Sequence, residues 1–221
     1  MTRAPHSPDF AHVETWIFDL DHTLYPPEAA LFAQIEVRMT DWVSRELGVD
    51  AQEADRLRAD YWARYGTTLS GMMVEHGTDP LPYLTYVHDI DFSCLSVDHG
   101  LASAINALPG RKVVFTNGSA PYARDVLRAR GLTGCFEAVY GIAEAGFHPK
   151  PKQEAFDAIL ARDGADPRVS AMFEDDPRNL SVPHALGMRT VHVAPTPLSP
   201  QPAHIHHHTD DLTRFLRGVS A

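Results

Sequence analysis

Three short apolar runs, each ending at polar residues, most limit what this chain can fold into. They cover residues 16–18 (WIF), 113–115 (VVF) and 171–173 (AMF), and they end at Asp19, Thr116 and Glu174. A fourth run, TVHVA from Thr190, closes the series. Helix-period patterns follow the later runs at 120–130, 153–163 and 177–186. Short buried strands that alternate with helices predict an α/β core with a doubly wound, Rossmann-like parallel sheet.

The region between the first two runs has a different pattern. It shows helical stretches at 29–47, 51–65, 69–76 and 82–87 and no strand-like run. We therefore predict an all-helical cap domain at 26–100, inserted into a core domain formed by 1–25 and 101–221. The Pro26-Pro27 pair and the segment 93–98 would be its two hinges.

Charge and apolar content exclude some classes of function. The formal net charge of −10 argues against a general nucleic-acid binder but is compatible with a small phosphorylated ligand. Neither the first fourteen residues nor any later segment has the apolar run of a signal peptide or a membrane span, so we expect no membrane partner. Cys94 and Cys135 lack zinc-type spacing and are expected to be reduced, packed thiols, which indicates a cytoplasmic protein. The sequence does not predict an oligomeric state.

The polar residues at the strand ends should meet, because ligands of open parallel sheets bind beyond the carboxyl ends of the strands. This edge would gather Asp19, Asp21, Thr116, Asn117, Glu174 and Asp175. Four carboxylates at one place require a cation, and Mg²⁺ is the natural oxygen-liganded ion for a phosphate site. Taken alone, Asp19 and Asp21 could instead be a solvated turn.

Four stretches resemble the motifs of the haloacid dehalogenase (HAD) superfamily, in the right order. DLDHT (19–23) resembles the first motif, VVFTNGS the second, KPKQEAF the third and FEDDPRNL the fourth. DxDxT alone is a weak signal, but all four in matching strand context are a specific one.

The resemblance implies roles for the acidic residues. Asp19 would attack phosphorus and form an aspartyl-phosphate, and Asp21 would protonate the leaving oxygen and then activate water. Mg²⁺ would be held by Asp19, the backbone carbonyl of Asp21, Asp175 and the adjacent Glu174.

The same resemblance implies a phosphate-binding set. Thr116 and the amide of Asn117 would hold phosphoryl oxygens, and Lys150 would balance the negative charge. Lys152 competes for the lysine role, but the six-residue spacing from Lys150 to Phe156 favours Lys150.

The second aspartate distinguishes two reactions of the superfamily. Dehalogenases lack an acid/base aspartate at that position and need no metal, so Asp21 and the acidic pair imply phosphoryl transfer. The insertion after the first motif resembles the helical C1 cap, which closes over the site and excludes water.

The flanks and cap resemble the pyrimidine 5′-nucleotidase branch, through FDLDHTLYP, YWARYGTTLSGMM, VHDIDF and FHPKPKQEAF. This implies a phosphatase acting on a pyrimidine nucleoside 5′-monophosphate. The alternatives are a sugar- or other small-metabolite phosphatase, a phosphomutase and a non-catalytic phospho-ligand-binding regulator.

Two residues depart from the family pattern. His22 stands at a position where Asn is frequent, and Asp176 stands where a Ser often follows the acidic pair. Asp176 could cap a helix or add an acid to the metal site.

Two further sets of residues have an open interpretation. Arg38, Tyr65, Thr67 and Thr68 could contact a substrate base or sugar, although packing in a helical core is the commoner role. The HIHHH tract at 204–208 could bind metal, but we expect a solvated loop because no acidic residue or thiol accompanies it.

Overall fold

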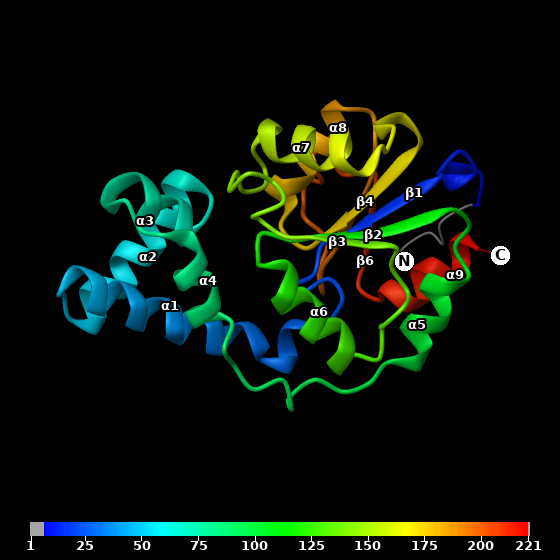
Figure 1. Cartoon of the computed structure of the whole chain (residues 1–221). Coiled ribbons are helices and arrows are strands. Elements are labelled where there is room, and N and C mark those ends of the chain that lie inside the picture. Colours follow the sequence, from blue (N-terminus) through cyan, green and yellow to red (C-terminus); the bar gives the residue numbers. More distant parts are fainter. Residues whose placement is uncertain (1–6, 221) are drawn as a thin grey trace.

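The computed structural model describes residues 7–220, so residues 1–6 and 221 of the predicted core lie outside it. Its centre is a parallel six-stranded sheet in the order β3-β2-β1-β4-β5-β6 (Figure 1). The strands are β1 (Thr15–Phe18), β2 (Arg111–Phe115), β3 (Ala138–Tyr140), β4 (Ser170–Glu174), β5 (Arg189–Val193) and β6 (His207–Thr209). The chain builds outward from β1 in both directions, which confirms the predicted doubly wound, Rossmann-like sheet.

Helices cover both faces of the sheet (Figure 1). On one face lie α5 (His99–Asn106), α6 (Ala120–Ala129) and α9 (Leu212–Val219), and on the other α7 (Gln153–Asp163) and α8 (Ser181–Ala185). The alternation of side chains along a strand explains the two layers. Trp16 and Phe18 belong to the core cluster of the first face, whereas Ile17 belongs to that of the second.

Some elements of the core were predicted from the sequence and others were not. The four apolar runs are β1, β2, β4 and β5, but β3, β6 and α5 were not predicted. The predicted helix at 177–186 is divided, because it begins as the 3₁₀ helix η4 (Pro177–Leu180) and continues as α8. The remaining 3₁₀ turns are η1 (Ser7–Phe10), η2 (Pro27–Ala29) and η3 (Pro167–Val169).

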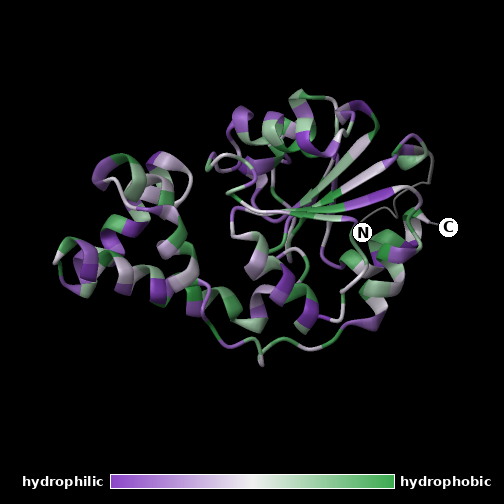
Figure 2. Cartoon of the chain, viewed as in Figure 1, coloured by the Kyte–Doolittle hydropathy of each residue, from purple (hydrophilic) through white to green (hydrophobic). Residues whose placement is uncertain are grey.

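Four of the helices between β1 and β2 lie beside the core and not on a face of the sheet (Figure 1). They are α1 (Leu31–Leu47), α2 (Ala51–Tyr65), α3 (Thr68–His76) and α4 (Pro80–Val87). Asp50 accepts a hydrogen bond from Glu53 N–H at the start of α2, and Gly48 and Gly66 end α1 and α2 with positive φ. Figure 2 shows hydrophobic residues along the strands of the core and a mixture of both kinds along these helices, which bury one side only.

Arg130, just after α6, ties both connections between the core and these four helices. Its guanidinium donates to the carbonyl oxygens of Leu24 and Ser96, and Nη2 lies 2.9 Å from Asp98 Oδ2. Leu24 precedes the first predicted hinge, whereas Ser96 and Asp98 lie in the second. A nearly buried side chain, 7% exposed, therefore holds the two crossing segments together.

The prediction of a solvated histidine loop at 204–208 is wrong. The tract runs into β6, which extends the sheet beyond β5, and Ile205 is buried. His206 Nδ1 accepts from Thr190 N–H at 3.1 Å, and His208 Nε2 lies 2.8 Å from the carbonyl oxygen of Ala194. These rings satisfy polar groups at the sheet edge, so the tract is structural.

The prediction that both thiols are packed holds for one of them. Cys135 is buried against the core, whereas Cys94 is exposed in the second connection. Across residues 7–220, no helix has the length and apolar character that crossing a bilayer requires.

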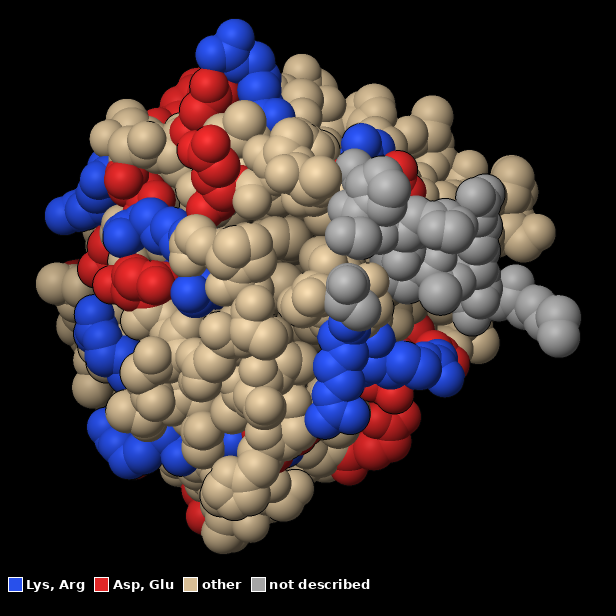
Figure 3. All heavy atoms as spheres, turned by 90° about the vertical axis from the view of Figure 1, so that its right-hand side faces the viewer, with Lys and Arg blue, Asp and Glu red and all other residues tan. Residues whose placement is uncertain are grey.

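Charged side chains of both signs lie next to each other on the face of the core shown in Figure 3. Exposed ion pairs such as Arg214–Asp210 (2.7 Å) and Arg168–Asp166 (2.8 Å) illustrate this kind of contact. Exposed pairs of this kind add little to the free energy of unfolding, because water and salt screen them, so the buried clusters supply most of the stability.

Candidate active site

The polar residues that follow β1, β2 and β4 meet at one edge of the sheet. These strands are neighbours, and Phe18 is in register with both Val114 and Phe173. The next residues along the chain therefore emerge together, and among them are Asp19, Thr116 and Glu174. All three are buried, with exposed fractions of 5%, 0% and 1%.

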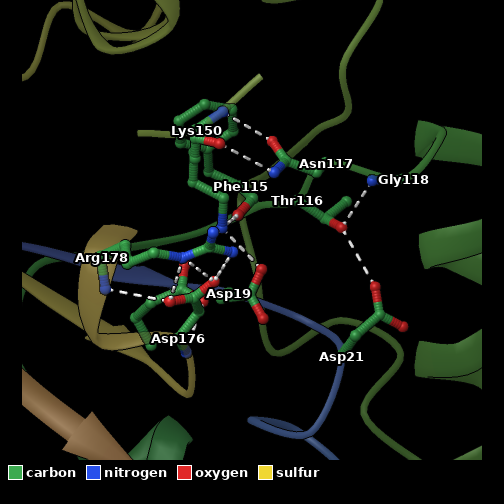
Figure 4. Close-up of polar contacts among 10 residues, drawn as sticks. Asp19, Asp21, Phe115, Thr116, Asn117, Gly118, Lys150, Asp176 and Arg178 are labelled. Atoms are coloured by element: carbon green, nitrogen blue, oxygen red, sulfur yellow. Dashed lines mark hydrogen bonds and ion pairs between the residues drawn. The ribbon is translucent and has the colours of Figure 1, made fainter. Parts of the chain in front are cut away.

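Lys150 is the cation at the centre of this edge (Figure 4). Its Nζ donates to Asp19 Oδ1 at 2.6 Å, to Glu174 Oε2 at 2.6 Å and to the carbonyl oxygen of Phe115 at 2.9 Å. These contacts use all three donors of the ammonium group. The pKa of Lys150 is raised because Asp19 and Glu174 outweigh the opposing effect of its burial.

The segment before α7 carries Lys150 into the site. Asn117 Oδ1 accepts from Lys150 N–H at 2.8 Å, and Asn117 Nδ2 donates to the carbonyl oxygen of Lys150 at 3.2 Å. Phe156, six residues on, packs edge-on against Phe115 at a ring-centroid distance of 5.5 Å. Lys152, the other candidate, is exposed and precedes α7.

Asp19, Glu174 and Asp175 form an acidic cluster in which one ligand atom from each lies within 4.8 Å of the others. The pKa of Asp175 is raised to about 10, first by burial and then by the negative charges of Glu174 and Asp19. Burial and Glu174 likewise raise the pKa of Asp19 to about 7, although Lys150 opposes this. Both pKa values are raised because one ammonium group does not offset three carboxyl groups at this place. A further cation would favour the ionised forms, and three hard oxygen donors suit a divalent ion.

The Asp21 carboxyl lies apart from that cluster. Its Oδ1 accepts from Tyr25 Oη and from Tyr122 Oη, both at 2.6 Å, whereas Oδ2 lies 3.5 Å from Thr116 Oγ1. Burial and the charge of Asp19 raise the pKa of Asp21, and the two tyrosine hydroxyls act in the opposite direction. Neither tyrosine was predicted from the sequence to belong to the site. Tyr25 is four residues from Asp21, which could have been a signal, but Tyr122 offered none.

The loop after β2 arranges Thr116 and the start of α6. Thr116 Oγ1 accepts from Gly118 N–H at 2.9 Å, which fixes the tight turn. Ser119 caps α6 by accepting from Tyr122 N–H at 3.3 Å. Ser119 Oγ also lies 3.1 Å from Nδ1 of His88, the residue that ends α4.

The two departures from the family pattern have local explanations. Asp176 caps η4 and forms a 2.6 Å ion pair with Arg178, so the prediction of a helix N-cap is confirmed (Figure 4). It is not a member of the acidic cluster. His22 has a φ of 59°, in the left-handed region that Asn adopts more readily than most residues.

A cavity of about 570 Å³ lies above these residues, between them and α1–α4. Its floor includes Asp19, Asp21, Lys150 and Asp175. Its roof is largely apolar and is lined by Phe32, Ile35, Met39, Trp62, Leu69, Tyr83, Leu84 and Val87. The site therefore faces a chamber large enough for a small organic molecule.

Of the four residues between 26 and 100 that could contact a substrate, two line the cavity and two do not. Thr67 and Thr68 line the cavity. Arg38 instead forms an ion pair with Asp89 and a hydrogen bond to the carbonyl oxygen of Tyr86, and Tyr65 donates to Glu75, so neither is among its lining residues. The roof also holds a polar pair that was not predicted from the sequence: Arg58 Nη1 lies 3.1 Å from Glu36 Oε1, and both residues line the cavity.

The helical roof also contacts the core across the chamber. The Arg178 guanidinium lies over the Trp62 ring, 3.8 Å from its centroid. Gly66 approaches the segment before Lys150 so closely that a Cβ there would lie 3.4 Å from Pro149 Cγ. Together with His88 against Ser119, these contacts join the roof to the rim of the site.

Comparison with known proteins identifies relatives by sequence. A family model described as haloacid dehalogenase-like hydrolase matches residues 13–187. Phosphate metabolism protein 8 of Saccharomyces cerevisiae is 27% identical over 197 residues, an alignment that covers 81% of this chain. The chain spans only 60% of the length of that yeast protein.

Solved structures share the fold at low sequence identity. The HAD phosphatase of Thermococcus onnurineus matches with a TM-score of 0.62 at 18% identity, over 93% of this chain and 97% of that one. An L-2-haloacid dehalogenase of Xanthobacter autotrophicus matches with a TM-score of 0.59 at 14% identity, over 93% and 97%. A putative HAD hydrolase of Bacillus subtilis bound to magnesium matches with a TM-score of 0.57 at 15% identity, over 94% and 98%.

Proposed function

The chain belongs to the haloacid dehalogenase-like hydrolases, and from this premise we propose that it is a Mg²⁺-dependent phosphate-monoester hydrolase. The observation that carries the proposal is the separate environment of two nearby carboxyls. Asp19 is held by Lys150 within the acidic cluster, whereas Asp21 is held by two tyrosine hydroxyls outside it. Two carboxyls in different environments suit two different roles, nucleophile and acid/base.

In the first step, an oxygen of the Asp19 carboxylate forms a bond to phosphorus while the bond to the leaving oxygen breaks. Asp21 supplies the proton that the leaving oxygen takes up. In the second step, water attacks phosphorus, Asp21 takes a proton from it, and the bond to Asp19 breaks to release inorganic phosphate. Thr116, the amide of Asn117 and Lys150 would hold the phosphoryl oxygens and balance their charge.

Mg²⁺ would be held by the carboxylates of Asp19, Glu174 and Asp175 and by the carbonyl oxygen of Asp21. When bound, it would neutralise charge on the phosphoryl oxygens. The magnesium in the Bacillus subtilis hydrolase is a property of that protein, but the matching fold adds support.

Dehalogenation is the competing reaction within the family, and structural neighbours include dehalogenases. Asp21 favours phosphoryl transfer, because attack on a carbon–halogen bond releases a halide that needs no proton. The acidic cluster points the same way, since neither displacement of a halide by a carboxylate nor hydrolysis of the resulting ester requires a metal site. The 27% identity to a yeast phosphate metabolism protein agrees with this choice.

For the substrate we propose a pyrimidine nucleoside 5′-monophosphate. The cavity of about 570 Å³ is lined by the rings of Phe32, Trp62 and Tyr83, which suit a flat base. Thr67 and the Arg58–Glu36 pair offer polar contacts. A sugar phosphate or another small phosphorylated metabolite is the alternative. We further propose that 26–100 is a C1-type cap and that 1–25 with 101–221 is the core.

Turnover of p-nitrophenyl phosphate with Mg²⁺ tests the reaction. The Asp19→Asn variant should lose at least about 10³-fold in kcat, because the amide is a poor nucleophile. Asp125→Asn is the matched control, since Asp125 pairs with exposed Arg128 on α6, away from the site. Absence of wild-type turnover, or equal turnover in Asp19→Asn, would overturn the proposal.

A panel of UMP, CMP, AMP and sugar phosphates tests the substrate. We expect the highest kcat/KM for UMP or CMP. A flat profile, or a clear preference for a sugar phosphate, would defeat the nucleotide assignment while leaving the phosphatase assignment in place.

A further inference from the structure

Two tyrosines from distant parts of the chain share one acceptor atom. Tyr25 Oη and Tyr122 Oη each lie 2.6 Å from Asp21 Oδ1, and the two hydroxyl oxygens are 3.3 Å apart. Tyr25 follows β1 in the chain, whereas Tyr122 lies in the first turn of α6. Their side chains are 1% and 2% exposed.

This arrangement makes the two oxygens of Asp21 unequal. Oδ1 accepts two short hydrogen bonds, because a phenolic hydroxyl 2.6 Å from a carboxylate oxygen acts as the donor. Oδ2 has only a contact of 3.5 Å to Thr116 Oγ1. A proton carried by Asp21 therefore belongs on Oδ2.

Tyr122 is itself held from two sides. His88 stacks on its ring with a centroid distance of 4.3 Å and an interplanar angle of 7°. Its backbone N–H donates to Ser119 Oγ, which also contacts His88 Nδ1. These contacts fix the plane of the Tyr122 ring and with it the direction of the hydroxyl group.

We propose that Tyr25 and Tyr122 are positioning residues, which orient the Asp21 carboxyl so that Oδ2 faces the leaving oxygen of the substrate. This inference rests on the proposed phosphatase function and deepens it. Neither tyrosine has to touch the substrate, since each acts through Asp21.

Orientation of Asp21 by the two tyrosines affects esters of different leaving groups unequally, which a purely structural role would not do. Protonation of the leaving oxygen matters most when the leaving group is a strong base. Phenolate is a stronger base than p-nitrophenolate, and the two esters have nearly the same shape. Misorienting Asp21 should therefore slow phenyl phosphate more than p-nitrophenyl phosphate, whereas general damage to the site should slow both alike.

The experiment compares kcat/KM for these two esters, with Mg²⁺, in wild type, Tyr122→Phe and Tyr25→Phe. The rate ratio of p-nitrophenyl to phenyl phosphate should rise about tenfold in each variant, a part of the 10²–10⁴-fold that a general acid supplies. Tyr140→Phe is the matched control, because Tyr140 also donates to a carboxylate, that of Asp163, at 2.8 Å, but outside the cavity lining. Its ratio should equal that of wild type.

Phenylalanine fills the volume of the tyrosine ring, so both variants should fold, and thermal unfolding checks this. If one fails to fold, the other decides. The inference would be overturned if the p-nitrophenyl to phenyl ratio of a folded variant stayed within about twofold of wild type, whether or not both rates fall. A ratio lower than that of wild type would overturn it as well. Absence of wild-type turnover would instead overturn the proposed function and this inference with it.

Discussion

The side chain of Asn117 holds the backbone of Lys150 at both its N–H and its carbonyl group. The two hydrogen bonds measure 2.8 and 3.2 Å and join the loop after β2 to the segment before α7. Lys150 Nζ in turn contacts Asp19 and Glu174, at the ends of β1 and β4. Asn117 thus fixes the backbone position from which the buried ammonium group reaches the acidic cluster.

Replacing Asn117 by Ala should therefore reduce catalysis through Lys150. We expect kcat to fall about 10- to 100-fold, because displacements near 1 Å in an active site have effects of this size. Steady-state kinetics measures it, and Asn106→Ala, at the exposed end of α5, is the control. An unchanged kcat in Asn117→Ala would show that Lys150 is fixed by other contacts.

Magnesium should stabilise the fold through the acidic cluster. Asp19, Glu174 and Asp175 share only the ammonium group of Lys150, so a divalent ion should bind among them in the folded protein. The free energy of unfolding should then rise by about 1.4 kcal/mol for each tenfold increase in the ion concentration above its Kd. Thermal unfolding with Mg²⁺ or with EDTA measures this effect without any substrate. Asp175→Asn should abolish the stabilisation and Asp125→Asn should retain it. Equal stabilisation in both variants would place the ion elsewhere.

Arg130 should be far more important to stability than its neighbour Arg128. Arg130→Met leaves the carbonyl groups of Leu24 and Ser96 without their donor, which should cost about 1–3 kcal/mol. Arg128→Met removes an exposed pair with Asp125 and should change stability by less than about 0.5 kcal/mol. Urea unfolding of both variants provides the comparison. Equal midpoints would show that the connections are held without Arg130.

The parts of the fold that could be predicted from sequence are those with a strong local signal. The runs that became β1, β2 and β4 are apolar because both faces of the central sheet are covered, and the polar residues after them mark the site. The edge strands β3 and β6 have three residues each and are half-buried, so they show neither an apolar run nor a clear alternation. His207–Thr209 looked like a loop because its partners lie on β5.

The missed site residues share one cause, which is dependence on tertiary contacts. Tyr122 donates to Asp21 across 101 residues of sequence, and its helical position fixes only which side of α6 it occupies. Arg38 and Arg58 both lie on amphipathic helices, but only the packing of α1 against α2 and α4 determines that Arg58 faces the cavity and Arg38 pairs with Asp89. Helical periodicity shows that a face is buried but not what covers it.

The stability of the protein should depend on pH through His88. Burial against Tyr122 lowers the pKa of this imidazole from 6.5 to about 4. Between these pH values the unfolded chain binds a proton that the folded chain does not. The free energy of unfolding should therefore fall as the pH decreases from about 6.5 to about 4.

His88→Asn isolates this contribution, because the other histidines titrate equally in both proteins. Between pH 7 and pH 4, wild type should lose up to about 3 kcal/mol more than the variant, at about 1.4 kcal/mol for each unit of pKa difference. Urea unfolding at pH 7, 6, 5 and 4 measures the two curves. Parallel curves would mean that His88 titrates normally and that its ring is not held neutral between Ser119 and Tyr122.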